Sequence, residues 1–486
     1  MRVSGIIVAI ALVSVSVWGE APYFATGIKV GEVTDSEARV WVRLTKDAKR
    51  VDFGAPLPIV RYRDTQTGEL VERASGRNWP NPEVSYPDGT TIDTIEGAAP
   101  GRSGRVRVYY RVEDAVFWQS TEWQDVVDAS DYTTQFELTG LKPDTRYNLR
   151  VVGTPPNGDE IKGRAVLGGF RTAPVEDTIT PVTFTVSTGQ RYTDLDSEDG
   201  YKIYDQMARL DPNFFVHTGD IVYYDVLGKS PALARWHWQR TYSLNSARRF
   251  HNNISSYFIK DDHDTLVNDC WPTMNSPFMG EMTFKKGLEI FREQVPMGEK
   301  TYRTVRWGKD LQIWMVEGRD FRSPNTMKDG PEKTIWGKEQ MDWFKRTVQE
   351  SDATFRVLIS PTPVVGPDRT KKKDNHANAG FTYEGNLLRE FIASQKNMIV
   401  ICGDRHWQYV SVDAEHGVKE FSCGPASDEH AGGWKNDMLR PEHKYLNVIG
   451  GFLAVTVERD GDVPVLVGRH HGVDGKVLNE DRITAE

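Results

Sequence analysis

The pattern of apolar and polar residues divides the chain into two parts. From about Ala25 to Thr172, short runs alternate between apolar and polar residues, which is the period of half-buried β-strands. After a linker at 172–181, continuous apolar runs alternate with segments of helical period. Such strand, loop and helix units predict an α/β domain over residues 180–486 with a buried sheet. Strands are predicted at Val182–Val186, Phe214–His217, Ser256–Lys260, Leu311–Val316, Thr354–Ser360 and Met398–Cys402, and helices at Tyr201–Leu210, Ala232–Ala247, Gly337–Glu350 and Glu384–Ser394.

The first part, residues 20–175, is predicted to be an all-β domain. Its segment from Leu138 to Leu149 is similar to the corner of a fibronectin type III-like or immunoglobulin-like sandwich, where a tyrosine, here Tyr147, packs at the bend. Residues 56–103 are rich in Pro, Gly, Asn and Asp, so they are expected to form an irregular insertion. This part of the sequence contains no cluster of catalytic residue types.

The N-terminus has the layout of a secretory signal. Met1 and Arg2 precede an apolar run from Gly5 to Val17, and small and acidic residues follow around Gly19. The run has about 13 residues, whereas a helix needs roughly 20 to cross a bilayer. We expect residues 1–19 to be a cleaved signal peptide and the mature protein to be exported, periplasmic or secreted, without a membrane span. A buried strand or a membrane anchor is the alternative.

Composition and charge disfavour several classes of protein. There are 60 Lys and Arg against 69 Asp and Glu, a formal net charge of −9, so the overall field disfavours a nucleic-acid-binding surface. The basic run Lys371–Lys373 is interpreted as a solvated loop. Three scattered cysteines, Cys270, Cys402 and Cys423, cannot form a disulfide framework or a Cys-x-x-Cys zinc site, and a bond between the last two is left open. The ligands of any metal must then be oxygen and nitrogen.

Polar clusters follow five of the predicted strands at the point where each strand ends. Because loops at the carboxyl ends of neighbouring strands converge on one crevice, these distant segments are predicted to form a single site. Hard oxygen donors with imidazole suit iron, manganese, zinc or calcium. The clusters are Thr188-Gly189-Gln190, Gly219-Asp220-Ile221-Val222-Tyr223-Tyr224-Asp225, Asp261-Asp262-His263-Asp264, Arg319-Asp320 and Gly403-Asp404-Arg405-His406.

Each cluster taken alone has a structural alternative. Gly219-Asp220 is commonly a turn. Asp261–Asp264 could be a solvated acidic loop, although three carboxylates beside a histidine repel one another and are tolerated best next to a cation. Asp404 and His406 lie on one side of an extended segment, where they could chelate a metal or belong to an ion-paired turn. The occurrence of all these clusters in this order favours a metal site.

The ordered blocks resemble the calcineurin-like metallophosphatase superfamily, and within it the PhoD-type alkaline phosphatases (alkaline phosphatase D). The resemblance implies a metallophosphatase core of two packed mixed sheets flanked by helices, preceded by the β-sandwich. It also implies metal-dependent hydrolysis of small phosphate mono- or diesters by an activated water. The matching blocks are Phe24–Leu44, Gly219–Asp225 (GDIVYYD), Asp261–Asp269 (DDHDTLVND), Glu317–Ser323 (EGRDFRS), Lys333–Phe344 (KTIWGKEQMDWF) and Gly403–His406 (GDRH).

The resemblance implies metal ligands in three of the blocks. Asp220 would be the carboxylate that bridges two metals, and Tyr223 would be the phenolate ligand of iron, with Tyr224 as a packing residue. Asp404 and His406 would take the places of two histidine ligands of the superfamily.

The remaining roles fall on the blocks Asp261–Asp269 and Glu317–Ser323. Asp262 would be a further metal ligand, and Asn268 would complete the calcium side. His263 would be the catalytic histidine, which protonates the leaving group, with its neighbour Asp264 as the carboxylate that orients the ring. Arg319 would hold the phosphate.

One block departs from the family pattern. PhoD-type proteins usually have Ser-Cys-Gln, with the cysteine as an iron ligand, where this chain has Thr188-Gly189-Gln190. Gly189 has no side chain that could bind a metal, so Gln190 or Asp194 could substitute. The resemblance implies Fe(3+) and Ca(2+) as cofactors, and the missing cysteine leaves other divalent metals possible.

Two other functions stay open at this point. The protein could be a phosphodiesterase specific for a lipid or a cell-wall polymer, with the insertion near 56–103 shaping the cleft. It could also be a non-catalytic binding protein in which the metal site has degraded at Gly189. The sequence does not indicate an oligomeric state.

Overall fold

The computed structural model describes residues 20–64, 66–72, 79, 81–158, 160, 163–369, 371–436 and 438–486. The predicted signal peptide, residues 1–19, lies outside this range. Within the described ranges, every helix is too short or too polar to cross a membrane.

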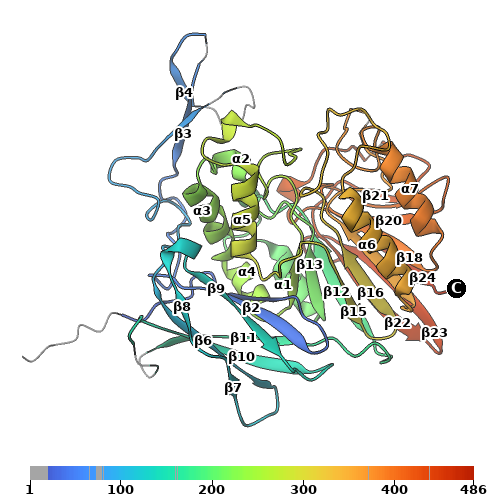
Figure 1. Ribbon diagram of the computed structural model, residues 1–486, viewed down its shortest axis with the longest axis horizontal. Helices are drawn as coiled ribbons and strands as arrows, with labels where there is room; N and C mark the ends of the chain where they lie inside the picture. The colour runs from blue at the N-terminus through green and yellow to red at the C-terminus, as the bar shows by residue number, and fades with distance from the viewer. Residues whose placement is uncertain are drawn as a thin grey trace, which may run out of the picture.

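The N-terminal region consists of β-sheets (Figure 1). Valines that alternate along the strands, such as Val40, Val42, Val106 and Val108, point into a shared core between two of these sheets. One sheet has the order β1-β2-β9, with bounds Ile28–Gly31, Glu37–Arg43 and Thr133–Thr139. The other has the order β11-β10-β6-β7, with β8 also beside β6, and bounds Arg164–Arg171, Arg146–Thr154, Gly104–Val112, Gln119–Ser120 and Gln124–Val126. The predicted all-β sandwich is confirmed.

The insertion near 56–103 is more regular than its composition predicts. It contains a three-stranded sheet of order β4-β3-β5, with bounds Leu70–Glu72, Ile59–Arg63 and Pro82–Ser85. Tyr62 of β3 is buried and stacks on Phe278, with 5.2 Å between the ring centroids. Packing of this kind stabilises short strands that local composition does not favour. The outer part of this sheet extends away from the body of the molecule (Figure 1).

The C-terminal region contains two mixed sheets that pack against each other. Apolar residues of both sheets, including Phe184, Val216, Ile313 and Val357, form one buried core. The six-stranded sheet has the order β14-β13-β12-β22-β23-β24, with bounds Ser256–Phe258, Phe214–His217, Val182–Ser187, Phe452–Asp460, Val463–His471 and Val477–Thr484. The seven-stranded sheet has the order β15-β16-β17-β18-β20-β19-β21, with bounds Arg303–Trp307, Leu311–Met315, Phe355–Ser360, Met398–Cys402, Lys419–Cys423, Gln408–Val412 and His443–Asn447.

Helices flank both sheets, which confirms the predicted fold class (Figure 1). Helices α1 (Lys202–Arg209) and α4 (Asn245–His251) pack on the six-stranded sheet, and α6 (Gly337–Glu350) and α7 (Thr382–Ala393) on the seven-stranded one. A third group, α2 (Tyr224–Leu227), α3 (Pro231–Tyr242) and α5 (Phe284–Gln294), packs with the insertion.

The prediction of a single helix at Ala232–Ala247 is wrong. This segment forms two helices, α3 and α4, because Leu244 is extended, with φ −63° and ψ 139°. Ser243 and Asn245, whose side chains compete for backbone hydrogen bonds, flank this break. The Ser243 hydroxyl donates to the Arg240 carbonyl, and the Asn245 amide donates to Asp199.

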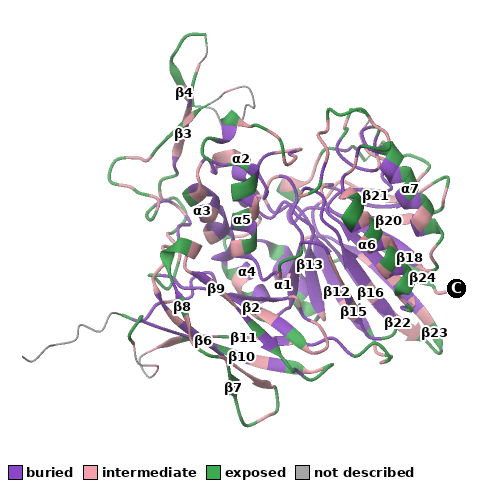
Figure 2. Ribbon diagram, viewed as in Figure 1, coloured by how far each residue is buried: buried purple, intermediate pink, exposed green. Residues whose placement is uncertain are grey.

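The strand directions bring the polar clusters together. Strands β12, β13 and β14 run parallel, as do β16, β17 and β18. These strands are buried (Figure 2), so the polar residues that they carry forward emerge only where the strands end. The carboxyl ends of the strands in both sheets therefore present their loops to a shared region.

Candidate metal centre

Asp220 occupies the turn that follows β13. The preceding Gly219 has φ +106°, and a Cβ there would lie 2.5 Å from the Cβ of Asp261, so the turn requires glycine. Asp220 itself is left-handed, with φ 56°, a conformation that concentrates at functional sites when it occurs outside glycine. The turn buries the carboxyl group, and Oδ1 has no hydrogen-bond partner among the described residues. Such an atom suits a cation.

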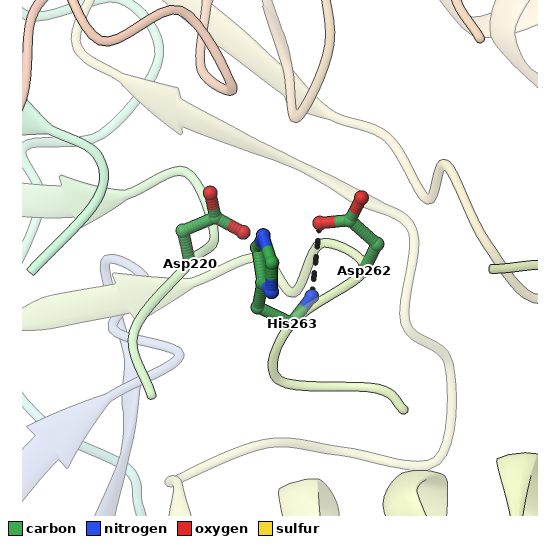
Figure 3. A group of neighbouring side chains, drawn as sticks. All are labelled: Asp220, Asp262 and His263. Atoms are coloured by element: carbon green, nitrogen blue, oxygen red, sulfur yellow. Dashed lines mark hydrogen bonds between the residues drawn. The ribbon is translucent and has the colours of Figure 1, made fainter. Parts of the chain in front are cut away.

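Two groups of donor atoms share Asp220. The first consists of Asp220, Asp262 and His263, and Figure 3 shows the imidazole between the two carboxyl groups. The second consists of Asp220, Asp261 and Asp404. In each group, one ligand atom per residue lies within 4.8 Å of the others. Asp404, like Asp220, is left-handed, with φ 61°. Two adjoining sets of donors with a common carboxylate are the arrangement that a pair of cations requires.

A third set of donors lies around Oδ2 of Asp220. The Asp220 Oδ2 atom is 3.3 Å from the Tyr223 hydroxyl and 3.3 Å from His406 Nε2. The Tyr223 hydroxyl is also 2.6 Å from Nε2 of His430, a residue outside all the predicted blocks. Burial, with nearby cations, lowers the pKa of His406 to about 3, and burial, with His406, lowers that of His430 to about 4. Both imidazoles are therefore neutral at neutral pH, which is the form that binds metals.

The carboxyl groups of the site have pKa values that are shifted in opposite directions. Burial raises the pKa of Asp220 to about 6, and burial raises that of Asp404 to about 7 against the opposing effect of Arg405. Burial also acts on Asp262, but Arg319 and His263 hold the pKa of this group well below its usual value. Of these three groups, Asp262 is thus ionised in the metal-free site, whereas Asp220 and Asp404 take up protons near neutral pH.

Arg319 is completely buried beside two of these carboxyl groups. Its Nε atom donates to Asp261 Oδ1 over 2.6 Å, and Nη2 lies 3.5 Å from Asp262 Oδ2. The family resemblance implies that Arg319 holds the phosphate, but in the structure its guanidinium is paired with carboxyl groups. Its sequence neighbour Asp320 pairs with Lys260, over 2.6 Å.

His263 has a different carboxylate partner from the one that sequence adjacency suggests. Its Nδ1 atom lies 3.0 Å from Oδ1 of Asp225, at the start of α2. Asp264 accepts hydrogen bonds from the backbone N–H groups of Ile221 and Asp261 instead, so the prediction that Asp264 orients the ring is wrong. Burial would lower the pKa of His263, but Asp225, Asp262 and Asp220 together hold it well above its usual value. Because Nδ1 contacts Asp225, Nε2 is the ring nitrogen that remains for a role in the site.

The remaining predicted residues lie around the site in different ways. The Gln190 side-chain oxygen accepts from the Tyr204 hydroxyl over 2.5 Å, so this oxygen is already bonded to α1. Tyr224 is fully buried and its hydroxyl accepts from Trp238, the packing role expected for one tyrosine of the pair. Asn268 precedes Asp269, whose backbone N–H donates to Asp262 Oδ2.

The basic run Lys371–Lys373 and the three cysteines were also considered in the sequence analysis. Lys371 and Lys373 are exposed, as expected for a solvated loop, but Lys372 between them is not: its ammonium pairs with Asp269 over 2.8 Å and with Asp374 over 3.1 Å. Cys402 and Cys423, like Cys270, are buried free thiols.

A family model described as PhoD-like phosphatase matches residues 184–452, more than half of the chain and every cluster of the site. The chain belongs to the PhoD-like phosphatase family. It is therefore a metal-dependent phosphoesterase, as its motifs predicted.

Solved structures share the fold of this PhoD-like phosphatase. The structure of PhoD has a TM-score of 0.70 and 15% sequence identity, covering 96% of this chain and 90% of that one. A purple acid phosphatase from yellow lupin (Lupinus luteus) seeds has a TM-score of 0.60 and 12% identity, covering 96% of this chain and 75% of that one. No curated protein sequence matches the chain.

The side chains of this PhoD-like phosphatase fit the divalent metals that its family implies. The three sets of donors contain only carboxylate, phenol and imidazole groups, which suit hard and borderline cations. The first two sets share Asp220, whose Oδ1 atom has no hydrogen-bond partner among the described residues. His430 is the one donor here that no sequence motif indicated.

Proposed function

We propose that this PhoD-like phosphatase is exported and hydrolyses small phosphoesters at two metal ions held around Asp220. The observation that carries the proposal is that one buried carboxylate belongs to two adjoining sets of donors. Asp262, Asp404, His406 and Tyr223 would provide further ligands, with Asn268 beside them in the loop of Asp262. Fe(3+) and Ca(2+) are the metals that the family resemblance suggests, and they would supply Lewis acidity, water activation and charge neutralisation at the phosphate.

His263 is the group that we assign to proton transfer. Its contact with Asp225 holds the ring and leaves Nε2 for the substrate side. The surrounding carboxylates favour the protonated imidazolium, so His263 can donate a proton to the leaving alkoxide.

We assign Arg319 to positioning rather than to phosphate contact. Its guanidinium is buried and paired with Asp261 and Asp262. It keeps Asp262 ionised and fixed in place, which prepares that carboxylate to bind a cation.

We further propose that residues 1–19 are a signal peptide and that 20–175 and 180–486 form two domains with a joint interface. Lys29 of β1 is buried and donates to the Gln294 carbonyl of α5 over 2.8 Å, and Trp41 of β2 donates to the Glu293 carbonyl over 2.8 Å. Buried polar contacts of this kind favour domains that are fixed relative to each other.

The test of the proposed function combines elemental analysis with a panel of phosphoesters. We expect bound metal in the purified protein, hydrolysis of p-nitrophenyl phosphate or bis-p-nitrophenyl phosphate, and loss of that hydrolysis after chelation, with recovery when metal is restored. The ratio of the two rates separates a monoesterase from a diesterase. Absence of bound metal together with no hydrolysis under any added divalent or trivalent ion would instead support a non-catalytic binding protein.

The pH dependence of the metal-free protein provides a further prediction. Asp220 and Asp404 have folded-state pKa values of about 6 and about 7, above the roughly 3.9 of an unfolded chain. The folded state therefore binds more protons, and this contribution to stability is lost as pH rises from about 4 to about 7. Buried histidines such as His217, whose pKa burial lowers to about 3, act in the opposite direction.

The comparison must therefore be made against a matched variant. Relative to the Asp220→Asn, Asp404→Asn double variant, the metal-free wild type should lose melting temperature between pH 5 and pH 8. Metal should restore it in the wild type alone, because bound cations replace the protons. If the melting temperatures of the two metal-free proteins changed with pH in the same way across this range, the assignment of these pKa values would be contradicted.

A further inference from the structure

Two imidazole rings border the space that a side chain at Gly189 would enter, where the family has its cysteine ligand. Gly189 follows β12 and has φ +48°. A Cβ at this position would lie 2.9 Å from His406 Nε2 and 3.2 Å from His430 Cδ2. Both distances are tighter than ordinary van der Waals contact, so a side chain at 189 would require His406, and to a smaller extent His430, to shift from their observed positions. The loss of one donor and the presence of another are thus linked in space.

Nε2 of His430 faces the other donors of the third set. This residue ends the short helix η5 (Asp428–His430), which follows β20. Its Nε2 atom lies 2.6 Å from the Tyr223 hydroxyl, and its ring centroid lies 4.1 Å from that of His406. The His406 Nε2 atom in turn lies 3.5 Å from the Tyr223 hydroxyl and 3.3 Å from Asp220 Oδ2. Two imidazole nitrogens, a phenol and a carboxylate therefore meet at one place.

The other nitrogen of His430 is held by a carboxylate. Nδ1 lies 2.8 Å from Oδ2 of Asp194, in the short helix η3 (Tyr192–Asp194). Arg191 donates two hydrogen bonds to the same carboxyl group, over 2.8 Å and 2.9 Å. Metal-binding histidines typically have such a carboxylate at the second nitrogen, which fixes the tautomer and the orientation of the ring. Asp194 thus serves as the support of His430 and is not itself placed as the ligand that replaces the cysteine.

We propose that His430 is a metal ligand that takes the place of the missing side chain at Gly189, together with Tyr223, His406 and Asp220. This inference rests on the proposed dimetal function. The cation at this position would have an imidazole where its relatives have a thiolate, and Asp194 would be its positioning residue.

The test measures metal content and affinity in the full-length protein, by elemental analysis and by competition with a chelator. His430→Ala should lose one of two metal equivalents, and Asp194→Asn should weaken the affinity for that metal about 10- to 100-fold. If the metal is ferric iron, the visible absorption band from the Tyr223 phenolate should be lost in His430→Ala and shifted in Asp194→Asn. His416→Ala, which changes a histidine paired with Asp413 outside the site, is the matched control.

A double variant tests whether side chains at positions 189 and 430 would occupy the same coordination site of the metal. In Gly189→Cys alone, the new side chain meets His406 and His430. In Gly189→Cys with His430→Ala, the His430 ring is gone and only His406 must shift to admit the new side chain. Metal content should then rise above that of His430→Ala, with a new thiolate absorption band. Circular dichroism of the metal-free variants checks that each one is folded. His430→Gln, which keeps a polar side chain, replaces His430→Ala if the latter does not fold.

The Asp220→Asn variant separates the two levels of the proposal. If Asp220→Asn loses metal while folded His430 variants keep both metals and an unchanged affinity and spectrum, the inference about His430 is overturned and the dimetal function stands. If Asp220→Asn also keeps full metal content, the proposed function itself is wrong.

Discussion

Asp220→Asn should abolish metal binding at both positions and lower turnover by about 10³-fold or more, because the metals contribute several kcal/mol to the barrier. Asparagine tolerates the left-handed backbone of this turn, so the change removes the charge without a new strain. Elemental analysis and steady-state rates at saturating metal would measure both effects.

The stability of the same variant separates a metal site from a structural carboxylate. Asp220 is buried and its Oδ1 lacks a partner, so its ionised form destabilises the metal-free fold. Metal-free Asp220→Asn should be at least as stable as the metal-free wild type at pH 8, and added metal should stabilise only the wild type. Asp342→Ala on the exposed face of α6 is a matched control that should change neither property. A large loss of metal-free stability in Asp220→Asn would indicate a structural role.

Much of the fold and part of the site could be predicted because the relevant signals are local. Continuous apolar runs such as Met398–Cys402 can be buried only as strands of a covered sheet. The polar residues directly after such strands, including Asp220 and Asp404, must then lie at one edge. Their sequence order sufficed to recognise the family.

The parts that could not be predicted depend on contacts between distant segments. The partner of His263 is Asp225, 38 residues earlier, whereas its sequence neighbour Asp264 holds backbone amides. His430 follows no predicted strand directly and belongs to no block, so nothing local distinguishes it. The sequence contained only an indirect signal: because Gly189 cannot bind a metal, another residue was expected to provide the ligand. The fold is needed to identify which residue lies there.

His263→Ala should keep its metals and lose about 10²- to 10⁴-fold in turnover, the usual contribution of a positioned general acid. The size of the loss should depend on the leaving group. An alkyl phosphate releases a strongly basic alkoxide that needs a proton, whereas p-nitrophenolate leaves without one. The variant should therefore be impaired far more on the alkyl ester than on p-nitrophenyl phosphate.

Asp225→Asn extends this test to the contact at Nδ1. Without the carboxylate, the imidazolium is less favoured and the ring is less firmly held. We expect a smaller loss of turnover than in His263→Ala, with the same dependence on the leaving group. Because His263 would lose its proton at lower pH, the fall in activity on the alkaline side of the pH profile should also begin at lower pH. Equal losses on both substrates would exclude proton donation by His263. A loss of bound metal in His263→Ala would instead identify this residue as a ligand, since its ring lies within the first set of donors.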